Sequence, residues 1–249
     1  MDGRLKNRIA VVTGAAAGLG KAAAIRLARE GCVVEILDLN DGAAAVAEIE
    51  GPGGEAHSMV CDCADEAQIA NAVKQIEARH GRIDILVNNA GILSGRKPWH
   101  ELSKEEVTRF VNINYLGYFL VTKAFYPLIL KSRTPRVIMV ASRTYFLANP
   151  GQMAYVASKG AVMGMMRVMA KEMGEQGIPV NAVMPGMVAT PGTEAHSQEE
   201  AFNRVMGNQA IRKRVTPEHL AGLIAFLASD DAELITGQTI LCDGGGYLH

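Results

Sequence analysis

The chain has 249 residues, of which 49% are apolar and 20% are charged, and its formal net charge is −1. This composition is typical of a folded globular protein, and a single α/β domain can reach this length. A nearly neutral chain lacks the basic field that holds nucleic acid or an anionic membrane, so we expect neither partner. The most apolar segment, 115–130, contains Lys123 and Pro127 and is shorter than a membrane span. Without a signal-peptide pattern before the first strand, we expect a cytoplasmic protein.

Cysteine and histidine spacing gives no metal motif. Cys61 and Cys63 lie at a C-x-C spacing that does not match the usual zinc pairs, and the six histidines show no ligand spacing. We therefore expect Cys32, Cys61, Cys63 and Cys242 to be free thiols, and we expect no metal site.

Short apolar runs alternate with segments of helical spacing along the chain. In chain order, we expect a strand at 8–12, a helix at 19–30, a strand at 33–37, a helix at 42–50, a strand at 56–60, a helix at 66–80, a strand at 83–87, a helix at 103–131, a strand at 136–141, a helix at 154–175, a strand at 179–183, a helix at 217–228 and a strand at 239–242. This alternation predicts right-handed parallel crossovers and a doubly wound α/β sheet of about seven strands, with helices on both faces. Such sheets bind ligands at the carboxyl ends of their strands.

The segment "TGAAAGLG" follows the first strand and contains Gly14, Gly18 and Gly20. Glycines allow a tight turn, and the amino end of the next helix offers N–H groups to a pyrophosphate. Many β–α turns use glycine without binding a ligand, so the turn alone does not decide between the two interpretations.

Acidic side chains follow the next two strands. Asp38 is placed to accept hydrogen bonds from the adenosine ribose and to repel a 2′-phosphate, which favours NAD over NADP. Its alternative role is to cap the next helix, although Asp41 is better placed for that. Asp62 is placed to bond the adenine edge or only to form a turn. "NNAG" at 88–91 can line a cofactor, tie strand ends together through its asparagines, or be only a loop.

Tyr155 and Lys159 are four residues apart, so they share one face of a helix. A neighbouring ammonium lowers the pKa of a phenol, which can then donate or remove a proton. The Y-x-x-x-K pattern also arises by chance. Ser142 follows the fifth strand at the ligand-binding edge, and Asn114 lies in an apolar segment where a buried amide needs a partner.

Taken together, "TGAAAGLG", "DILVNNAG", "NYLG", Ser142 with "YVASK", the "PG" at 185–186 with Thr190, and "ITGQTILCDGG" resemble the short-chain dehydrogenase/reductase family over essentially the whole chain. The resemblance implies one Rossmann-type domain over 1–249 with a nicotinamide cofactor, usually as a tetramer. It implies that Tyr155 is the acid/base, Ser142 holds the substrate oxygen, Lys159 binds the nicotinamide ribose and Asn114 supports a water. The implied cofactor-binding residues are Gly14, Gly18, Leu19, Gly20, Asp38, Leu39, Asp62, Cys63, Asn89, Ala90, Gly91, Tyr155, Lys159, Pro185, Gly186, Val188 and Thr190.

Loop residues favour particular ligands. NADP-preferring relatives often carry a basic residue where this chain has Ala17, so we expect NAD. The loops after the fifth and sixth strands are similar to those of NAD-dependent 1-phenylethanol dehydrogenases. We therefore expect a secondary alcohol or its ketone in an apolar pocket covered by a lid at about 187–214. The expected lining residues are Ser142, Thr144, Tyr145, Phe146, Met187, Phe202 and Met206.

Other functions stay open from the sequence. Arg143 turning inward would instead favour an acid as substrate. The alternatives are a 3-oxoacyl-carrier-protein reductase, to which the basic run at 212–214 could contribute a docking patch, a sugar or polyol dehydrogenase, and a non-catalytic NAD-binding regulator. We expect a homotetramer built from the C-terminal strand and the helices at 103–131 and 154–175.

Overall fold

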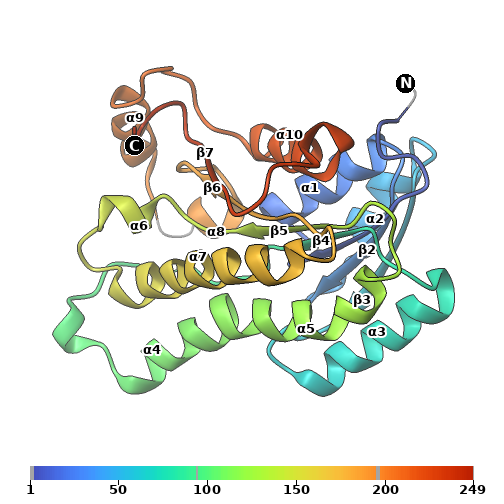
Figure 1. The fold of residues 1–249 in the computed structure, drawn as a ribbon. Coiled ribbons are helices and arrows are strands. Elements are labelled where there is room, and N and C mark those ends of the chain that lie inside the picture. The colour runs from blue at the N-terminus through green and yellow to red at the C-terminus, as the bar shows by residue number, and fades with distance from the viewer. Residues whose placement is uncertain (1–2, 94, 195–196, 249) are drawn as a thin grey trace.

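The computed structural model describes residues 3–93, 95–194 and 197–248. Seven parallel strands form one sheet in the order β3-β2-β1-β4-β5-β6-β7 (Figure 1). The strands are β1 Ile9–Thr13, β2 Val33–Asp38, β3 Glu55–Val60, β4 Ile85–Asn88, β5 Arg136–Val140, β6 Val180–Pro185 and β7 Thr239–Cys242. The sheet predicted from the alternation is confirmed, and each strand lies within two residues of its predicted position.

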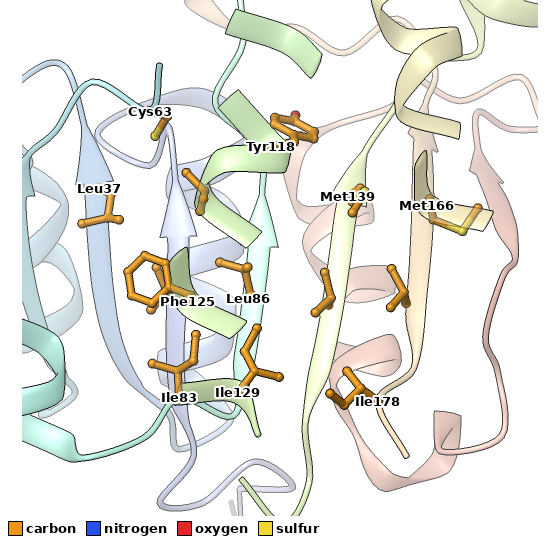
Figure 2. Close-up of a cluster of buried hydrophobic side chains, with 14 of the residues drawn as sticks. Leu37, Cys63, Ile83, Leu86, Tyr118, Phe125, Ile129, Met139, Met166 and Ile178 are labelled. Carbon is orange, nitrogen blue, oxygen red and sulfur yellow. The ribbon is translucent and has the colours of Figure 1, made fainter. Parts of the chain in front are cut away.

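Helices cover both faces of the sheet and form two cores. On one face lie α3 Glu66–His80, α5 Gly117–Ile129 and α7 Met153–Gly174, and on the other α1 Gly18–Arg29, α2 Ala43–Glu50 and α10 Pro217–Ala228. Figure 2 shows the first core, where Phe125, Ile129 and Met166 lie over the strands. Every residue of β1, β4, β5 and β6 is buried. Parallel strands covered on both sides read as continuous apolar runs, which is why their positions were predictable.

The helix predicted at 103–131 is wrong as a single element. It is divided into α4 Lys104–Val111, a π-helical turn η2 at Asn112–Leu116, and α5. The start was predictable because Ser103 and Glu106 form the expected capping box. A single π-helical turn of five residues is too short to be recognised from apolar spacing, so the sequence did not indicate it. Such turns often occur at functional sites.

Several short elements were not predicted. They are η1 Trp99–Glu101, α6 Thr144–Leu147, α8 Pro191–Glu194, α9 Glu199–Gly207 and η3 Asp230–Ala232. Each is too short for helical periodicity to stand out. In Figure 1, α6 and α9 lie near the amino end of α7, beside the carboxyl ends of the strands. Within the described ranges, no helix has the length and apolar character needed to cross a membrane.

Candidate active site

The glycine-rich turn after β1 is tightly packed against the loop after β4. Gly14 and Gly18 have φ angles of 64° and 59°, which side chains rarely adopt. A Cβ at Gly14 would lie 2.7 Å from the Cα of Ala90, and one at Gly18 would lie 3.7 Å from Thr190. No side chain of the described residues caps α1 at Ala17, so the N–H groups of its first turn are free to bind an anion. These features fit the pyrophosphate of a dinucleotide.

Asparagine side chains join neighbouring strand ends, as one interpretation of "NNAG" predicted. The Asn89 side-chain amide donates to the carbonyl oxygens of Thr13 and Gly14, both at 2.9 Å. Asn88 donates to Thr122 Oγ1 at 2.9 Å. Thr13, which the sequence did not single out, accepts from the backbone N–H groups of Asn89 and Ala90 at 2.9 and 3.0 Å. Together these bonds hold the glycine-rich turn, residues 13–20, against the loop after β4; we call this turn the cradle.

Asp38 lies at the end of β2 against the glycine-rich turn. Its Oδ2 accepts from the backbone N–H of Ala16 at 3.0 Å, and its Oδ1 accepts from the backbone N–H of Asn40 at 2.9 Å. Asp41 instead bonds the backbone N–H of Ala43 at the start of α2, at 2.9 Å. The carboxylate of Asp38 therefore lies beside the glycine-rich turn, whereas Asp41 accepts a hydrogen bond at the amino end of α2.

The residues predicted at the adenine end are spread around the loop after β3. Asp62 accepts from the backbone N–H of Ala64 at 2.8 Å, so it forms a turn as its alternative interpretation proposed. Cys63 is buried, whereas Leu39 is 63% exposed. All four cysteines are free, as predicted. A contact of these residues with adenine stays a prediction.

The loop after β6 lies opposite the cradle. A Cβ at Gly186 would lie 3.0 Å from Asp243, so this glycine lets the loop approach the C-terminal segment. Val188 is buried and pairs with Val215 in a short parallel bridge. Thr190 of the same loop lies against Gly18 of the glycine-rich turn, while a contact of Pro185, Gly186 and Val188 with the cofactor stays a prediction.

Ser142 and Tyr155 are buried close together at the carboxyl edge of the sheet, and both are less than 10% exposed. Burial raises the pKa of Tyr155, and the hydrogen bond with Ser142 acts in the opposite direction. Ser142 Oγ also accepts from Thr144 Oγ1 at 2.9 Å. A carbonyl or hydroxyl oxygen placed here could bond both the serine and the tyrosine.

Lys159 lies one turn of α7 after Tyr155 and is also buried. Its Nζ donates to the carbonyl oxygen of Val140 at 2.8 Å and to Tyr118 Oη at 3.2 Å. Burial lowers the pKa of Lys159 to about 7. The sequence led us to expect that Lys159 lowers the pKa of Tyr155. In the structure, burial is the largest influence on both groups: it lowers the pKa of Lys159 and raises the pKa of Tyr155. Tyr118 was not predicted, because it sits in an apolar helix as a core residue would.

Asn114 is fully buried in η2 and finds the partners that its position required. Its side chain accepts from the backbone N–H of Ile92 at 2.8 Å and donates to the Ile92 carbonyl and to Ser158 Oγ, both at 3.1 Å. Ser158 in turn donates to the carbonyl oxygen of Tyr155 at 2.7 Å. A Cβ at Gly91 would lie 3.0 Å from Asn114 Oδ1 and 3.6 Å from Lys159 Nζ. These contacts bring Asn114, Tyr155, Lys159 and Gly91 into one region.

The aromatic residues predicted for the substrate pocket contact other parts of the protein. Phe146 stacks on Tyr247 with ring centroids 4.8 Å apart, and Tyr145 packs edge-on against Phe146 at 5.3 Å. A Cβ at Gly160 would lie 2.9 Å from the ring of Tyr145, so this ring lies against α7. Tyr247, near the end of the chain, had no sequence signal as a site residue.

Residues of the predicted lid and Arg143 are also packed. Phe202 of α9 is 5% exposed, with the guanidinium carbon of Arg214 4.4 Å from its ring centroid. Met187 and Met206 are half-buried. Arg143 is buried and forms a salt bridge with the buried Asp243 at 3.1 Å. Its charge is therefore already paired within the protein.

Comparison with known proteins agrees with this geometry. The family described as "Enoyl-(Acyl carrier protein) reductase" matches residues 14–247. This chain belongs to the short-chain dehydrogenase/reductase family. It is an oxidoreductase of the type that uses a nicotinamide cofactor and a small-molecule substrate, and the resemblance seen in its motifs is confirmed.

Relatives within the family have different substrates. The chain is 37% identical over 244 residues to a 3-oxoacyl-[acyl-carrier-protein] reductase of Thermotoga maritima, covering 97% of this chain and 98% of the relative. It is 36% identical over 246 residues to a cyclopentanol dehydrogenase of Comamonas sp., covering 98% of each. A structure from Beutenbergia cavernae, described as a candidate NAD(P)-dependent gluconate 5-dehydrogenase with NADP bound at low occupancy, has a TM-score of 0.91, 35% identity and 99% coverage of both chains.

Proposed function

We propose that the protein interconverts a neutral secondary alcohol and its ketone with NAD(H), and that Tyr155 is the acid/base. The observation that carries this proposal is the burial of Ser142, Tyr155 and Lys159 together at the carboxyl edge of the sheet. The full set of proton-handling residues argues against a non-catalytic regulator.

The residues around the glycine-rich turn fit a nicotinamide dinucleotide. The uncapped amino end of α1 would bind the pyrophosphate, and Asp38 would accept from the adenosine ribose hydroxyls. Lys159 would exchange its present bonds for the nicotinamide ribose hydroxyls. When bound, the nicotinamide supplies or accepts the hydride.

The proton moves through Tyr155. During reduction, its O–H donates a proton to the carbonyl oxygen while Ser142 donates a hydrogen bond to the same oxygen. During oxidation, the phenolate of Tyr155 accepts the proton of the alcohol. Burial of Ser142 and Tyr155 keeps water from competing for these bonds.

Asp38 supports a preference for NAD, because its carboxylate would face the 2′-phosphate of NADP. We expect kcat/KM for NAD to exceed that for NADP by at least about tenfold, and we expect Asp38→Ala to narrow this ratio. Asp41→Ala is the matched control, since Asp41 bonds only the start of α2 among the described contacts. If the unmodified protein used NADP as well as NAD or better, the proposed preference for NAD would be wrong.

The substrate proposal rests on Arg143 and on the apolar residues beyond Ser142. Because Arg143 is paired with Asp243, a substrate carboxylate would meet no free cation from this residue. We propose that the described parts of the predicted lid, 187–194 and 197–214 with α8 and α9, close over a mostly apolar pocket; residues 195–196 of the predicted lid lie outside the described residues. A panel of secondary alcohols with NAD, followed through the absorbance of the reduced cofactor, tests the reaction class.

The second candidate is reduction of a 3-oxoacyl thioester, favoured by the relative from Thermotoga maritima. That activity would show as rapid oxidation of NADPH or NADH with a 3-oxoacyl carrier-protein substrate and slow turnover of simple alcohols. A sugar or polyol dehydrogenase activity would show as preferential oxidation of gluconate or a polyol in the same panel.

A further inference from the structure

A buried carboxylate lies in the sheet far from the active site. Glu35 of β2 is fully buried, and its pairing partner across the edge of the sheet is His57 of β3. Directly paired residues of parallel strands point to the same face, here the face that α3 covers. His80, the last residue of α3, lies over the pair, and its Nε2 is 2.7 Å from Glu35 Oε1. In Figure 1, α3 ends on the side of the molecule opposite α6 and α9.

Two polar atoms of this cluster have no hydrogen-bond partner in the described part of the chain. They are Glu35 Oε2 and His57 Nε2, and both atoms are buried. Arg79 Nη1 and His80 Nε2 both contact Glu35 Oε1. The ion pair with Arg79 therefore leaves Glu35 Oε2 without a hydrogen bond from these side chains. Buried polar atoms without partners are rare in folded proteins, and each needs an explanation.

The three side chains have the geometry and chemistry of a metal-binding site. One ligand atom from each of Glu35, His57 and His80 lies within 4.8 Å of the others. Tetrahedral zinc, with bonds of about 2.0–2.1 Å, needs ligand atoms roughly 3.3 Å apart, so small side-chain rotations would suffice. Glu55 Oε1 is 3.5 Å from His57 Nε2 and could supply a fourth ligand. Two imidazoles and one or two carboxylates are ligands that Zn²⁺ prefers.

We infer that Glu35, His57 and His80 form a structural Zn²⁺ site that fastens the end of α3 to the β2–β3 edge of the sheet. The ion would bond Glu35 Oε2 and His57 Nε2, which have no hydrogen-bond partner among the described residues, and would take over the charge compensation of Glu35 from Arg79. Arg79 can turn to solvent, because its side chain is 34% exposed. Access is open through His57 and Glu55, whose side chains are 35% and 62% exposed on the edge strand.

Zinc titration of the full chain, after dialysis against EDTA, tests the site. We expect one Zn²⁺ per chain to bind with a micromolar or lower Kd. At 100-fold excess over Kd, we expect the Tm to rise by about 5 °C or more. His57→Gln and Glu35→Gln should each weaken binding at least about tenfold and remove the rise in Tm. His100→Gln is the matched control, because this exposed histidine lies in η1, away from the cluster.

Co²⁺ provides a second measurement that does not depend on enzyme activity. A tetrahedral site of nitrogen and oxygen ligands should give visible ligand-field bands without the strong near-ultraviolet band of a thiolate ligand. If Glu35→Gln fails to fold, His57→Gln on the edge strand is sufficient for the comparison. Absence of saturable Zn²⁺ binding, or binding that His57→Gln leaves unchanged, would show that Glu35 is held by Arg79 and His80 alone.

Discussion

The amine of Lys159 lies 3.2 Å from the hydroxyl of Tyr118, a fully buried residue of α5. Tyr118 Oη also donates to the carbonyl oxygen of Val140 at 3.2 Å, the same oxygen that Lys159 bonds. Figure 2 shows Tyr118 at one end of the core, beyond Phe125. Tyr118 therefore helps to hold the lysine amine in place.

Tyr118→Phe should remove this support without opening a large cavity. Loss of one hydrogen bond costs about 0.5–1.5 kcal/mol. We expect a comparable fall in the free energy of unfolding, a two- to tenfold fall in kcat, and an unchanged KM for the alcohol. Tyr126→Phe is the control, because the Tyr126 hydroxyl lies at the surface near Gln176. Unchanged kcat and unchanged Kd for NADH in Tyr118→Phe would show that Tyr118 is only a packing residue.

The lowered pKa of Lys159 predicts a pH-dependent stability in protein without added nucleotide. Its pKa falls from 10.5 to about 7 on burial, so the unfolded chain binds more protons than the folded one between these values. The contribution of Lys159 to the free energy of unfolding therefore rises with pH over this range. Lys159→Met should be more stable than the unmodified protein near pH 6, and the Tm difference should shrink by roughly 5 °C towards pH 9.5.

Lys171→Met is the control for that measurement, because Lys171 is exposed on the same helix. Its Tm difference from the unmodified protein should not change with pH. A pH-independent Tm difference for Lys159→Met would mean that Lys159 keeps an ordinary pKa in the folded protein.

The sheet was predictable because each buried parallel strand is a continuous apolar run followed by a turn or a helix start. The same reasoning identified Ser142, Tyr155 and Asp38, since strand ends and helix faces place residues without knowledge of their partners. It failed for η2, because one π-helical turn of five residues is too short to be recognised from hydrophobic spacing. Residues that act only through tertiary contacts carried no local signal, as Thr13, Tyr118 and Ser158 show.

The cluster at the end of α3 illustrates the same limit. Glu35, His57 and His80 are too far apart in the chain for any metal-binding motif, so their spacing predicted no site. Strand register and the path of α3 bring them together.

The substrate pocket can be tested with the unmodified protein and one variant. We expect larger kcat/KM values for 1-arylethanols than for small hydroxy acids, because Arg143 is already paired. Phe146→Ala should lower the ratio of kcat/KM for 1-phenylethanol to that for 2-butanol by about tenfold. Using a ratio cancels any general loss of folded protein. Preferential oxidation of a small hydroxy acid would instead mean that Arg143 leaves Asp243 to bind substrate.

Assembly is expected to be tetrameric, with a mass of about 106 kDa, four times 26.6 kDa. Apolar side chains are exposed where contacts between copies were predicted, such as Val168 of α7 at 56% and Leu130 after α5 at 48%. Light scattering at micromolar concentration measures the mass directly, and Val168→Glu should lower it. A mass near 27 kDa for the unmodified protein would exclude the tetramer.

The proton-transfer role of Tyr155 is tested most directly by Tyr155→Phe. This variant loses only the hydroxyl, so its Tm and its Kd for NADH should stay close to those of the unmodified protein. We expect NAD-linked oxidation of 1-phenylethanol to slow by about 10²- to 10⁴-fold, as loss of general acid–base catalysis does. Near-normal turnover by Tyr155→Phe, with the fold and NADH binding intact, would contradict the proposed function.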